Sequence, residues 1–272
     1  MTGTGAVDRA AGWRPRGLCV DVDGVLLRRP AVVPGANEFL DCLRARGVPF
    51  RIVTNNSRQR AEEAAADLTA VGLPVAPAEV MTAAEAMAEH VARLAAQQPG
   101  LRVFAAATPD LVTTLESRGL RVVADSADLV CLGHNPDLTY DRLARICDEV
   151  RRCRRLIVAN LDATIPSHGG EIPGVGAIAA AVTVATGVEP FNVGKPAPTM
   201  LLLAASELGL APGDMLMVGD RLDSDILGAN RAGMRSALVL GGAHGLADVA
   251  DSSARPDYVF PSLADLRAAL VD

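Results

Sequence analysis

Short runs of aliphatic residues alternate with longer segments rich in Ala, Leu, Glu and Arg along most of the chain. The short runs predict β-strands and the longer segments predict α-helices. The strands are nearly continuous apolar runs, which is typical of parallel strands covered by helices on both faces. The predicted strands are 18–20, 50–53, 102–106, 121–123, 129–132, 156–159, 215–218, 237–240 and 258–260, and the predicted helices include 36–46, 60–71, 83–97, 140–152, 177–186 and 199–208.

This alternation predicts an α/β fold with a doubly wound, mostly parallel, Rossmann-like sheet. Ligands of such sheets bind beside the carboxyl ends of the strands. The residues that directly follow each predicted strand are therefore the first candidates for chemistry.

The composition supports a folded protein and excludes several classes of partner. Half of the 272 residues are hydrophobic and 21% are charged, which is enough to bury a full core in one large domain or two ordinary ones. The net charge of -6 and the 3% aromatic content argue against binding to nucleic acid or to an anionic membrane surface. No apolar run reaches the ~20 residues that a membrane helix needs.

The cysteines bear on the compartment. Five are present, an odd number, scattered and never spaced as Cys-x-x-Cys, which argues against a disulfide framework or a zinc site. The first 17 residues also contain no apolar signal-peptide centre. We therefore expect a cytoplasmic protein.

Polar clusters follow three of the predicted strands. They are Asp21–Val25 after the first strand, Thr54–Ser57 after the second, and Gly219–Asp225 after the strand at 215–218. A fourth short motif, Gly194-Lys195-Pro196, stands just before a predicted helix. Each motif alone is typical of a turn, a loop or a helix N-cap. Together they place acids, a hydroxyl and a lysine at one edge if their strands share a sheet, which indicates a catalytic site.

Spacing excludes two other motifs and weakens a third. Counted from Asp21, an EF-hand loop would need glycine at position six and glutamate at position twelve, which is Val32. A phosphate-binding P-loop would need Ser or Thr where Pro196 stands. The segment Gly174–Ala179 matches G-x-G-x-x-A, but a dinucleotide-binding loop must directly follow its strand, and the nearest one ends 14 residues earlier. A loop that enters a close-packed helix is the favoured interpretation.

The four motifs, in their order D-V-D-G-V, T-N-N-S, G-K-P and G-D-R-L-D-S-D-I, resemble those of the haloacid dehalogenase (HAD) superfamily of phosphatases. The resemblance extends from Leu18 to about Leu270. The residue patterns at 160–166, 172–181 and 185–187 are similar to those of the NagD-like branch. That branch includes nitrophenylphosphate, phosphoglycolate, glycerol-phosphate and pyridoxal-phosphate phosphatases.

The resemblance implies roles that chemistry supports. Asp21 would be the nucleophile that forms a phosphoaspartate, which divides one difficult step into two easier ones. Asp23 would be the general acid for the leaving alkoxide and then the base for water. Thr54 and the backbone of Asn55 would bind the phosphoryl oxygens, and Lys195 would neutralise developing charge and orient Asp21.

The resemblance also implies a Mg²⁺ cofactor, because two carboxylates beside a phosphate would otherwise repel it. Asp21 and Asp220, with the backbone carbonyl of Asp23, would supply its oxygen ligands. Asp225, and less directly Asp223, would lie in the outer shell or hold a metal-bound water.

The spacing of the motifs predicts the domains. Thr54 and Lys195 are 141 positions apart, whereas a strand-helix-strand unit uses ~30 residues. About 100 residues are therefore inserted, and they resemble the α/β cap of the NagD-like branch. We predict a catalytic core from 1–80 and 189–272, and an inserted cap at 81–188 that closes over the phosphate site and contacts the leaving group.

Residues that bind the rest of the substrate are expected on cap loops and near the second motif. Asp162 is favoured because it follows a predicted strand and matches the family's N-x-D pattern. The substrate-binding candidates are Asn55, Asn56, Arg58, Asn135, Asp162 and His168, with His134, Thr164 and Glu171 as further cap positions.

The sequence thus predicts a Mg²⁺-dependent phosphoric monoester hydrolase for a small phosphorylated metabolite of the glycerol-phosphate or phosphoglycolate type. One alternative is a phospho-accepting signalling module, whose ~120-residue domains also combine acids, Thr and Lys around Mg²⁺. The other is a dinucleotide-dependent oxidoreductase built on Gly174–Ala179. The expected partner is a small phosphate monoester. A homodimer is one candidate assembly.

One compositional feature singles out a residue. Of the 26 Lys and Arg residues, only Lys195 is a lysine. A chain that meets its other cationic needs with Arg retains this ammonium at the motif where the resemblance implies a catalytic lysine. Lysine is a compact point charge, and Arg is not its equivalent at a crowded phosphoryl site.

Overall fold

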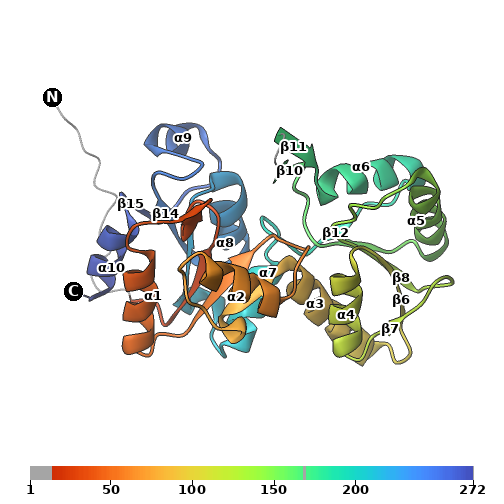
Figure 1. Ribbon diagram of the computed structural model, residues 1–272, viewed down its shortest axis with the longest axis horizontal. Coiled ribbons are helices and arrows are strands. Elements are labelled where there is room, and N and C mark those ends of the chain that lie inside the picture. The colour runs from red at the N-terminus through yellow and green to blue at the C-terminus, as the bar shows by residue number, and fades with distance from the viewer. Residues whose placement is uncertain (1–13, 168–169, 272) are drawn as a thin grey trace. The chain divides into compact units, whose positions relative to one another are not determined.

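The computed structural model describes residues 14–167 and 170–271. They form two compact units (Figure 1). The first contains the described residues up to Thr54, together with Ala65–Met81 and the chain from Lys195 onward. The second contains Asn55–Ala64 and Thr82–Gly194.

The first unit is built on a six-stranded sheet in the order β15-β14-β13-β1-β4-β5. The pairings of β1 with β4 and β13, of β13 with β14, and of β14 with β15 are all parallel. The chain extends the sheet from β1 to one side and later to the other, as a doubly wound fold requires. The strands are β1 (Gly17–Asp21), β4 (Phe50–Thr54), β5 (Val80–Thr82), β13 (Met215–Gly219), β14 (Arg235–Val239) and β15 (Tyr258–Phe260), with a small hairpin of β2 (Leu27–Arg28) and β3 (Ala31–Val32).

Helices cover this sheet and bury its central strands. All five residues of β1 and all five of β13 are buried, as expected for parallel strands between two layers of helices. Helix α7 packs on β1 and β4 and against α8, whereas α1 and α10 pack on each other. The helices are α1 (Ala36–Ala45), α2 (Ala61–Ala70), α7 (Thr199–Glu207), α8 (Leu227–Ala232), α9 (Leu246–Asp251) and α10 (Leu263–Val271), with a π-helical turn at Leu222–Ile226.

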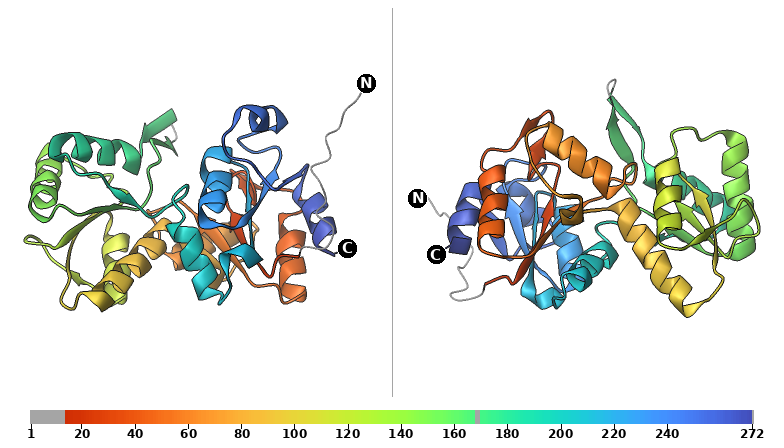
Figure 2. Two further views of the ribbon diagram at one scale, coloured as in Figure 1. Left: turned by 180° about the vertical axis from the view of Figure 1, so that it is seen from behind. Right: turned by 60° about the horizontal axis from the view of Figure 1, so that its bottom comes forward.

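The second unit contains a five-stranded sheet in the order β12-β9-β8-β6-β7, and all its neighbouring strands are parallel. An antiparallel hairpin of β10 and β11, drawn in green in Figure 2, follows β9 along the chain. The strands are β6 (Arg102–Ala106), β7 (Arg121–Val122), β8 (Leu129–Leu132), β9 (Leu156–Val158), β10 (Thr164–Ser167), β11 (Gly170–Pro173) and β12 (Phe191–Asn192), and the helices are α3 (Ala83–Gln97), α4 (Pro109–Ser117), α5 (Tyr140–Cys153) and α6 (Val175–Thr186).

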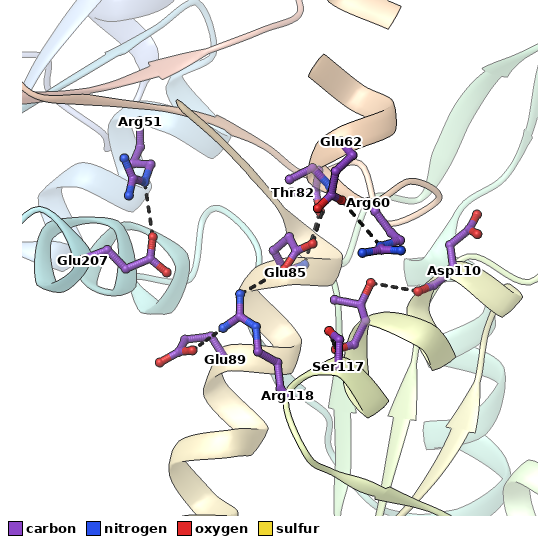
Figure 3. Close-up of polar contacts among 12 residues, drawn as sticks. Arg51, Arg60, Glu62, Thr82, Glu85, Glu89, Asp110, Ser117, Arg118 and Glu207 are labelled. Atoms are coloured by element: carbon purple, nitrogen blue, oxygen red, sulfur yellow. Dashed lines mark hydrogen bonds and ion pairs between the residues drawn. The ribbon is translucent and has the colours of Figure 1, made fainter. Parts of the chain in front are cut away.

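Local sequence signals explain where the helices of this unit begin. Thr82 caps α3 by accepting a hydrogen bond from the Glu85 backbone N–H at 3.2 Å (Figure 3). Thr139 caps α5 in the same way, and the buried residues Ile146, Cys147 and Val150 form its apolar face. Arg118 of the segment after α4 forms ion pairs with Glu85 and Glu89 of α3 (Figure 3).

The bounds of the two compact units differ from the predicted domain bounds at three places. Residues 189–194 were expected in the core, but Phe191 and Asn192 form β12 and pair with Ile157 and Val158 of β9 in the second unit. This strand is only two residues long, so the sequence contains no apolar run that would predict it. Asn55–Ala64 also belong to the second unit, although they lie far from the predicted insertion, and Met81 belongs to the first.

The predicted strands are all present, with ends that differ by up to two residues. The hairpins β2–β3 and β10–β11 and the strands β5 and β12 were not predicted, because short or exposed strands carry a weak periodic signal. None of the helices in the described ranges is both long and apolar enough to cross a membrane.

The prediction for Gly174–Ala179 is confirmed: this loop enters a close-packed helix. A Cβ on Gly174 would lie 2.2 Å from the Asp162 carbonyl oxygen, and one on Gly176 would lie 2.3 Å from that of Leu161. The start of α6 is therefore packed against the backbone that follows β9. That contact, rather than an approach to a pyrophosphate, accounts for these two glycines.

Candidate active site

Three neighbouring strands of the first unit end at the same edge of their sheet. Asp21 is the last residue of β1, and it lies opposite Val53 of β4 in the parallel register. On the other side Val20 lies opposite Val218 of β13. The register therefore brings Asp21, Thr54 and the segment that begins at Asp220 to one edge, as the strand-end motifs predicted.

Lys195 lies at the centre of this edge. Its Nζ donates to Asp21 Oδ1 at 2.5 Å, to Asp225 Oδ1 at 2.7 Å and to the Val53 carbonyl oxygen at 3.3 Å. The residue is only 2% exposed. Burial lowers the pKa of its ammonium, but Asp21 and Asp225 raise it by more, so the pKa lies above its ordinary value and the group stays charged.

The two carboxylate oxygens of Asp220 differ in their contacts. Its Oδ2 accepts a hydrogen bond from the Ala243 backbone N–H at 2.7 Å. Its Oδ1 is buried and has no hydrogen-bond partner among the described residues. A buried carboxylate oxygen left in this state is costly unless a ligand binds it.

The donor set fits a hard divalent cation. Asp21, Asp220 and Asp225 each offer an oxygen, and these atoms lie within 4.8 Å of one another. Burial raises the pKa of Asp21 well above its ordinary value, and burial together with the Asp225 charge raises that of Asp220. The three carboxylates together carry more negative charge than the single ammonium of Lys195 can neutralise. Carboxylate oxygens are also the preferred ligands of Mg²⁺.

Glycines surround Asp220 closely. A Cβ on Gly24 would lie 1.9 Å from Asp220 Oδ2, and one on Gly242 would lie 2.2 Å from it. Gly24 also has a φ of +86°, which favours glycine. The absence of a side chain on Gly24, in the first motif, therefore leaves space for the Asp220 carboxylate of the fourth motif.

Asp225 lies in the π-helical turn that follows β13. Besides Lys195, it accepts a hydrogen bond from the Arg221 backbone N–H at 3.1 Å. Asp223 on the same turn instead forms an exposed ion pair with Arg221 at 2.9 Å. Asp225 thus contacts the lysine directly, whereas Asp223 lies outside the group of three acids.

Asp23 is placed differently from Asp21. Its side chain is 65% exposed and lies 3.4 Å from Nε of Arg29. Its backbone forms an isolated bridge with Leu27. The carboxylate of Asp23 is therefore mostly exposed to solvent, whereas that of Asp21 is buried and held by Lys195.

In the second unit, the residue after Thr54 contacts a predicted substrate-binding residue. Asn55 Nδ2 donates to Asp162 Oδ1 at 3.2 Å. Asn56 accepts from the Arg58 backbone N–H at 2.9 Å and donates to Gln59 at 2.8 Å. The structure therefore joins Asn55 with Asp162, whereas Asn56 mainly organises its own loop.

The remaining predicted cap residues are spread over two loops and a hairpin. His134 and Asn135 follow β8 and are half-buried, and the His134 backbone N–H donates to Ser57 Oγ at 3.2 Å. Burial and the nearby Arg58 charge lower the pKa of His134. Thr164 and Glu171 lie on the exposed hairpin. His168 lies outside the described residues.

Comparison with known proteins decides the family. Residues 18–121 match a model described as haloacid dehalogenase-like hydrolase, and residues 192–266 match one described as HAD-hydrolase-like. An acid sugar phosphatase of Staphylococcus aureus is 35% identical over 252 residues, which cover 92% of this chain and 96% of that protein. The chain belongs to the HAD superfamily. It is a phosphatase of the NagD-like branch.

Solved structures agree with this assignment. A 4-nitrophenylphosphatase from Thermotoga maritima superposes with a TM-score of 0.86 at 32% identity, and covers 94% of this chain and 97% of its own. NagD from Escherichia coli K-12 superposes with a TM-score of 0.86 at 28% identity, and covers 93% and 98%. The resemblance seen in the four motifs thus extends to the whole HAD phosphatase fold.

Several residues of this HAD phosphatase site were missed by sequence reasoning. The Val53 carbonyl oxygen binds Lys195, the Ala243 backbone N–H binds Asp220, and the Asn160 side chain binds the backbone of Asn55. The first two are backbone groups and leave no signal in residue identity. Asn160 directly follows a predicted strand and begins the N-x-D pattern that singled out Asp162, but the sequence analysis gave it no role.

Proposed function

We propose that this HAD phosphatase hydrolyses a small phosphate monoester through a phosphoaspartate on Asp21, with Mg²⁺ as its cofactor. The observation that supports this most is the buried contact of Lys195 with Asp21 and Asp225 next to the unsatisfied oxygen of Asp220. A nucleophilic carboxylate held by an ammonium, beside acids that fit a hard cation, suits attack on phosphorus.

The proposed reaction has two balanced steps. An oxygen of Asp21 forms a bond to phosphorus while the bond from phosphorus to the ester oxygen breaks, and Asp23 protonates the departing alkoxide. Asp23, now ionised, takes a proton from water as the water oxygen attacks the phosphoaspartate. Phosphate leaves, Asp21 is restored as a carboxylate and Asp23 regains its proton.

Asp21 and Asp220, with the Asp23 backbone carbonyl, would hold the cation. When bound, Mg²⁺ would neutralise negative charge between these acids and the substrate phosphate. The buried Oδ1 of Asp220 gives it a ligand that no described residue satisfies. Asp225, through its contact with Lys195, keeps the lysine in place rather than serving the substrate directly.

We assign transition-state contacts to Lys195, Thr54 and the Asn55 backbone N–H. Lys195 binds Asp21, the proposed nucleophile, in this structure. We expect its buried ammonium to bind the phosphoryl oxygens as well during the transfer step. Thr54 ends β4 next to Asp21 and is 8% exposed. Donors fixed on strand ends need little reorganisation when the reaction occurs.

We assign a different part of the function to each unit. The first would carry the phosphoryl chemistry, and the second would act as the cap that selects the leaving group. Asn135, Asp162, Arg58 and Asn56 are the cap residues we expect to meet the substrate, and His168 belongs to the same expectation. The boundary of the cap is better placed at Thr82–Gly194 with Asn55–Ala64 than at 81–188.

For the substrate we propose a small phosphorylated polyol or hydroxy acid, of the glycerol-phosphate or phosphoglycolate type. The similarity to an acid sugar phosphatase supports a hydroxyl-bearing leaving group. Amide and carboxylate side chains such as Asn135 and Asp162 can bind hydroxyl groups by hydrogen bonds. All five cysteines are free thiols, which suits a reducing, cytoplasmic compartment.

A panel of phosphorylated metabolites tests the proposal. We expect Mg²⁺-dependent phosphate release with the largest kcat/KM on a small polyol or hydroxy-acid phosphate, and none from Asp21→Asn. Rapid quenching with labelled substrate should trap an acid-stable, base-labile acyl phosphate on Asp21. Turnover by Asp21→Asn, or a phosphorylated state that persists for minutes without release, would contradict the proposed function.

A further inference from the structure

Two residues of the second unit stand next to catalytic candidates in the chain. Asn55 directly follows Thr54, and Gly194 directly precedes Lys195. The chain leaves the first unit after Thr54 and enters it for the last time at Lys195. Contacts that fix Asn55 and Gly194 therefore also restrain Thr54 and Lys195, because each is the adjacent residue in the chain.

The side chain of Asn160 holds the first of these residues. Asn160 is 5% exposed, and its Nδ2 donates to the Asn55 carbonyl oxygen at 2.7 Å. Its Oδ1 accepts from the Asp162 backbone N–H at 3.1 Å. Asn55 Nδ2 in turn donates to the Asp162 carboxylate at 3.2 Å, which closes a ring of hydrogen bonds around three residues. A ring in which each member is bonded to both others fixes the Asn55 peptide firmly.

Gly194 is packed against the same ring. A Cβ on Gly194 would lie 2.5 Å from the Ala159 carbonyl oxygen, 2.8 Å from Asn55 Oδ1 and 3.0 Å from the Asn160 Cβ. Asn192 binds both the N–H and the carbonyl oxygen of Gly194, at 3.2 Å and 2.9 Å. The segment that leads into Lys195 is thus held in contact with the segment that leaves Thr54.

The first unit joins the same two segments a second time. Lys195 Nζ donates to the carbonyl oxygen of Val53, the residue before Thr54. Lys195 therefore binds Val53 within the first unit, and Asn160 binds Asn55 within the second. Asn160 contributes the side-chain donor of the second link, although it belongs to none of the four motifs.

We propose that Asn160 is a positioning residue for phosphoryl transfer, which keeps Thr54 and Lys195 in working geometry by holding Asn55 and Gly194. The inference rests on the proposed function, because it assumes that Thr54 and Lys195 act on the phosphoryl group. A misplacement of about 1 Å in such groups can cost roughly 10²-fold in rate. Since the phosphoryl group is common to all esters, the loss of Asn160 should slow every substrate by a similar factor.

The test compares Asn160→Ala and Asn160→Asp with the parent on 4-nitrophenyl phosphate and on glycerol phosphate. Asn160→Asp keeps the size and the Oδ1 acceptor and removes the donor to Asn55, so it serves if Asn160→Ala does not fold. We expect kcat to fall about 10-fold or more on both esters and by similar factors, given the cost of misplaced groups. Thr114→Val is the matched control, because Thr114 is 1% exposed and its hydroxyl donates to the Asp110 carbonyl oxygen within α4 of the same unit.

A double-mutant cycle with Lys195→Met decides whether Asn160 acts through the lysine. If it does, the double variant should be little slower than Lys195→Met alone, because residues that act as a unit give non-additive losses. Additive losses, a loss confined to one ester, or kcat within threefold of the parent in a folded variant would each overturn the inference. Full activity in Lys195→Met itself would instead reject the proposed function, and the positioning role with it.

Discussion

Lys195 and Asp225 form a buried ion pair in which Nζ and Oδ1 are 2.7 Å apart. The resemblance of the motifs implies that Asp225 lies in the outer shell of a metal ion or holds a metal-bound water, and the structure also gives it the lysine as a direct partner. Asp225 also accepts the Arg221 backbone N–H, so the acid itself is fixed. The lysine therefore approaches Asp21 from a position that Asp225 determines, and removal of the lysine would leave the buried charges of Asp21 and Asp225 without their ammonium partner.

Lys195→Arg should lower kcat by roughly 10²-fold or more, the scale of losing one electrostatic donor. The ammonium has three oxygen contacts in a site that is 2% exposed, and the planar guanidinium cannot reproduce them in the same space. Steady-state kinetics on 4-nitrophenyl phosphate measure the effect. Arg16→Lys, at a surface pair, is the control and should keep the parent rate. A near-parent kcat for Lys195→Arg would show that the lone lysine has no catalytic role.

Asp23→Asn should slow the hydrolysis of alkyl phosphates much more than that of 4-nitrophenyl phosphate. An alkoxide needs a proton as it leaves, whereas nitrophenolate is stable enough to leave without one. The exposed carboxylate of Asp23 pairs only loosely with Arg29, at 3.4 Å, so its removal should not disturb the fold. The ratio of the two kcat values between parent and variant is the measurement. Equal losses on both esters would argue against a general acid.

Removal of divalent metal with EDTA should abolish activity, and Mg²⁺ should restore it. Ca²⁺ should restore little, because it takes more ligands at longer distances and would disturb attack by Asp21. Asp220→Asn should weaken binding of Mn²⁺, followed by its paramagnetic resonance signal in the absence of substrate. Asp223→Asn is the matched control, since Asp223 is an exposed acid on the adjoining turn and lies outside the group of three. Equal Mn²⁺ binding by the two variants would be evidence against this metal site.

Asp162→Asn and Asn135→Ala should change the ranking of substrates more than the rate on 4-nitrophenyl phosphate. Both residues follow strands of the second unit, where we place the leaving-group contacts. The metabolite panel, scored by kcat/KM, measures the ranking. Asp148→Asn, at an exposed pair with Arg151, should leave the ranking unchanged. If Asp162→Asn and Asn135→Ala also keep the parent ranking, these loops do not select the substrate.

Gly174→Ala should destabilise the second unit by about 1–3 kcal/mol, the usual cost of forcing an added methyl into a packed interior. The new Cβ would lie 2.2 Å from the Asp162 carbonyl oxygen. Thermal or urea unfolding measures the loss. Gly213→Ala is the control, because its Cβ would meet nothing within 4 Å. Unchanged stability in Gly174→Ala would show that the loop is not close-packed, and would reopen a ligand-binding role for its glycines.

The residues that gather at the candidate site were largely readable from the sequence. Apolar strands that end in Asp21, Thr54 and Asp220 predicted that these residues meet at one sheet edge, since parallel strands in one sheet end together. The long interval between Thr54 and Lys195 indicated an inserted unit. These predictions succeed because strand periodicity and strand ends are local properties of the chain.

Other features depended on which distant segments pack together, and only the tertiary structure decided them. The two-residue strand β12 forms because β9 offers it a partner, so no local pattern marks it. The unsatisfied oxygen of Asp220, the pairing of Asp225 with Lys195, and the contact of Asn160 with Asn55 join residues that lie far apart in sequence. Local residue patterns thus determined the kinds of groups present and the edge at which they gather, whereas long-range packing determined which group holds which.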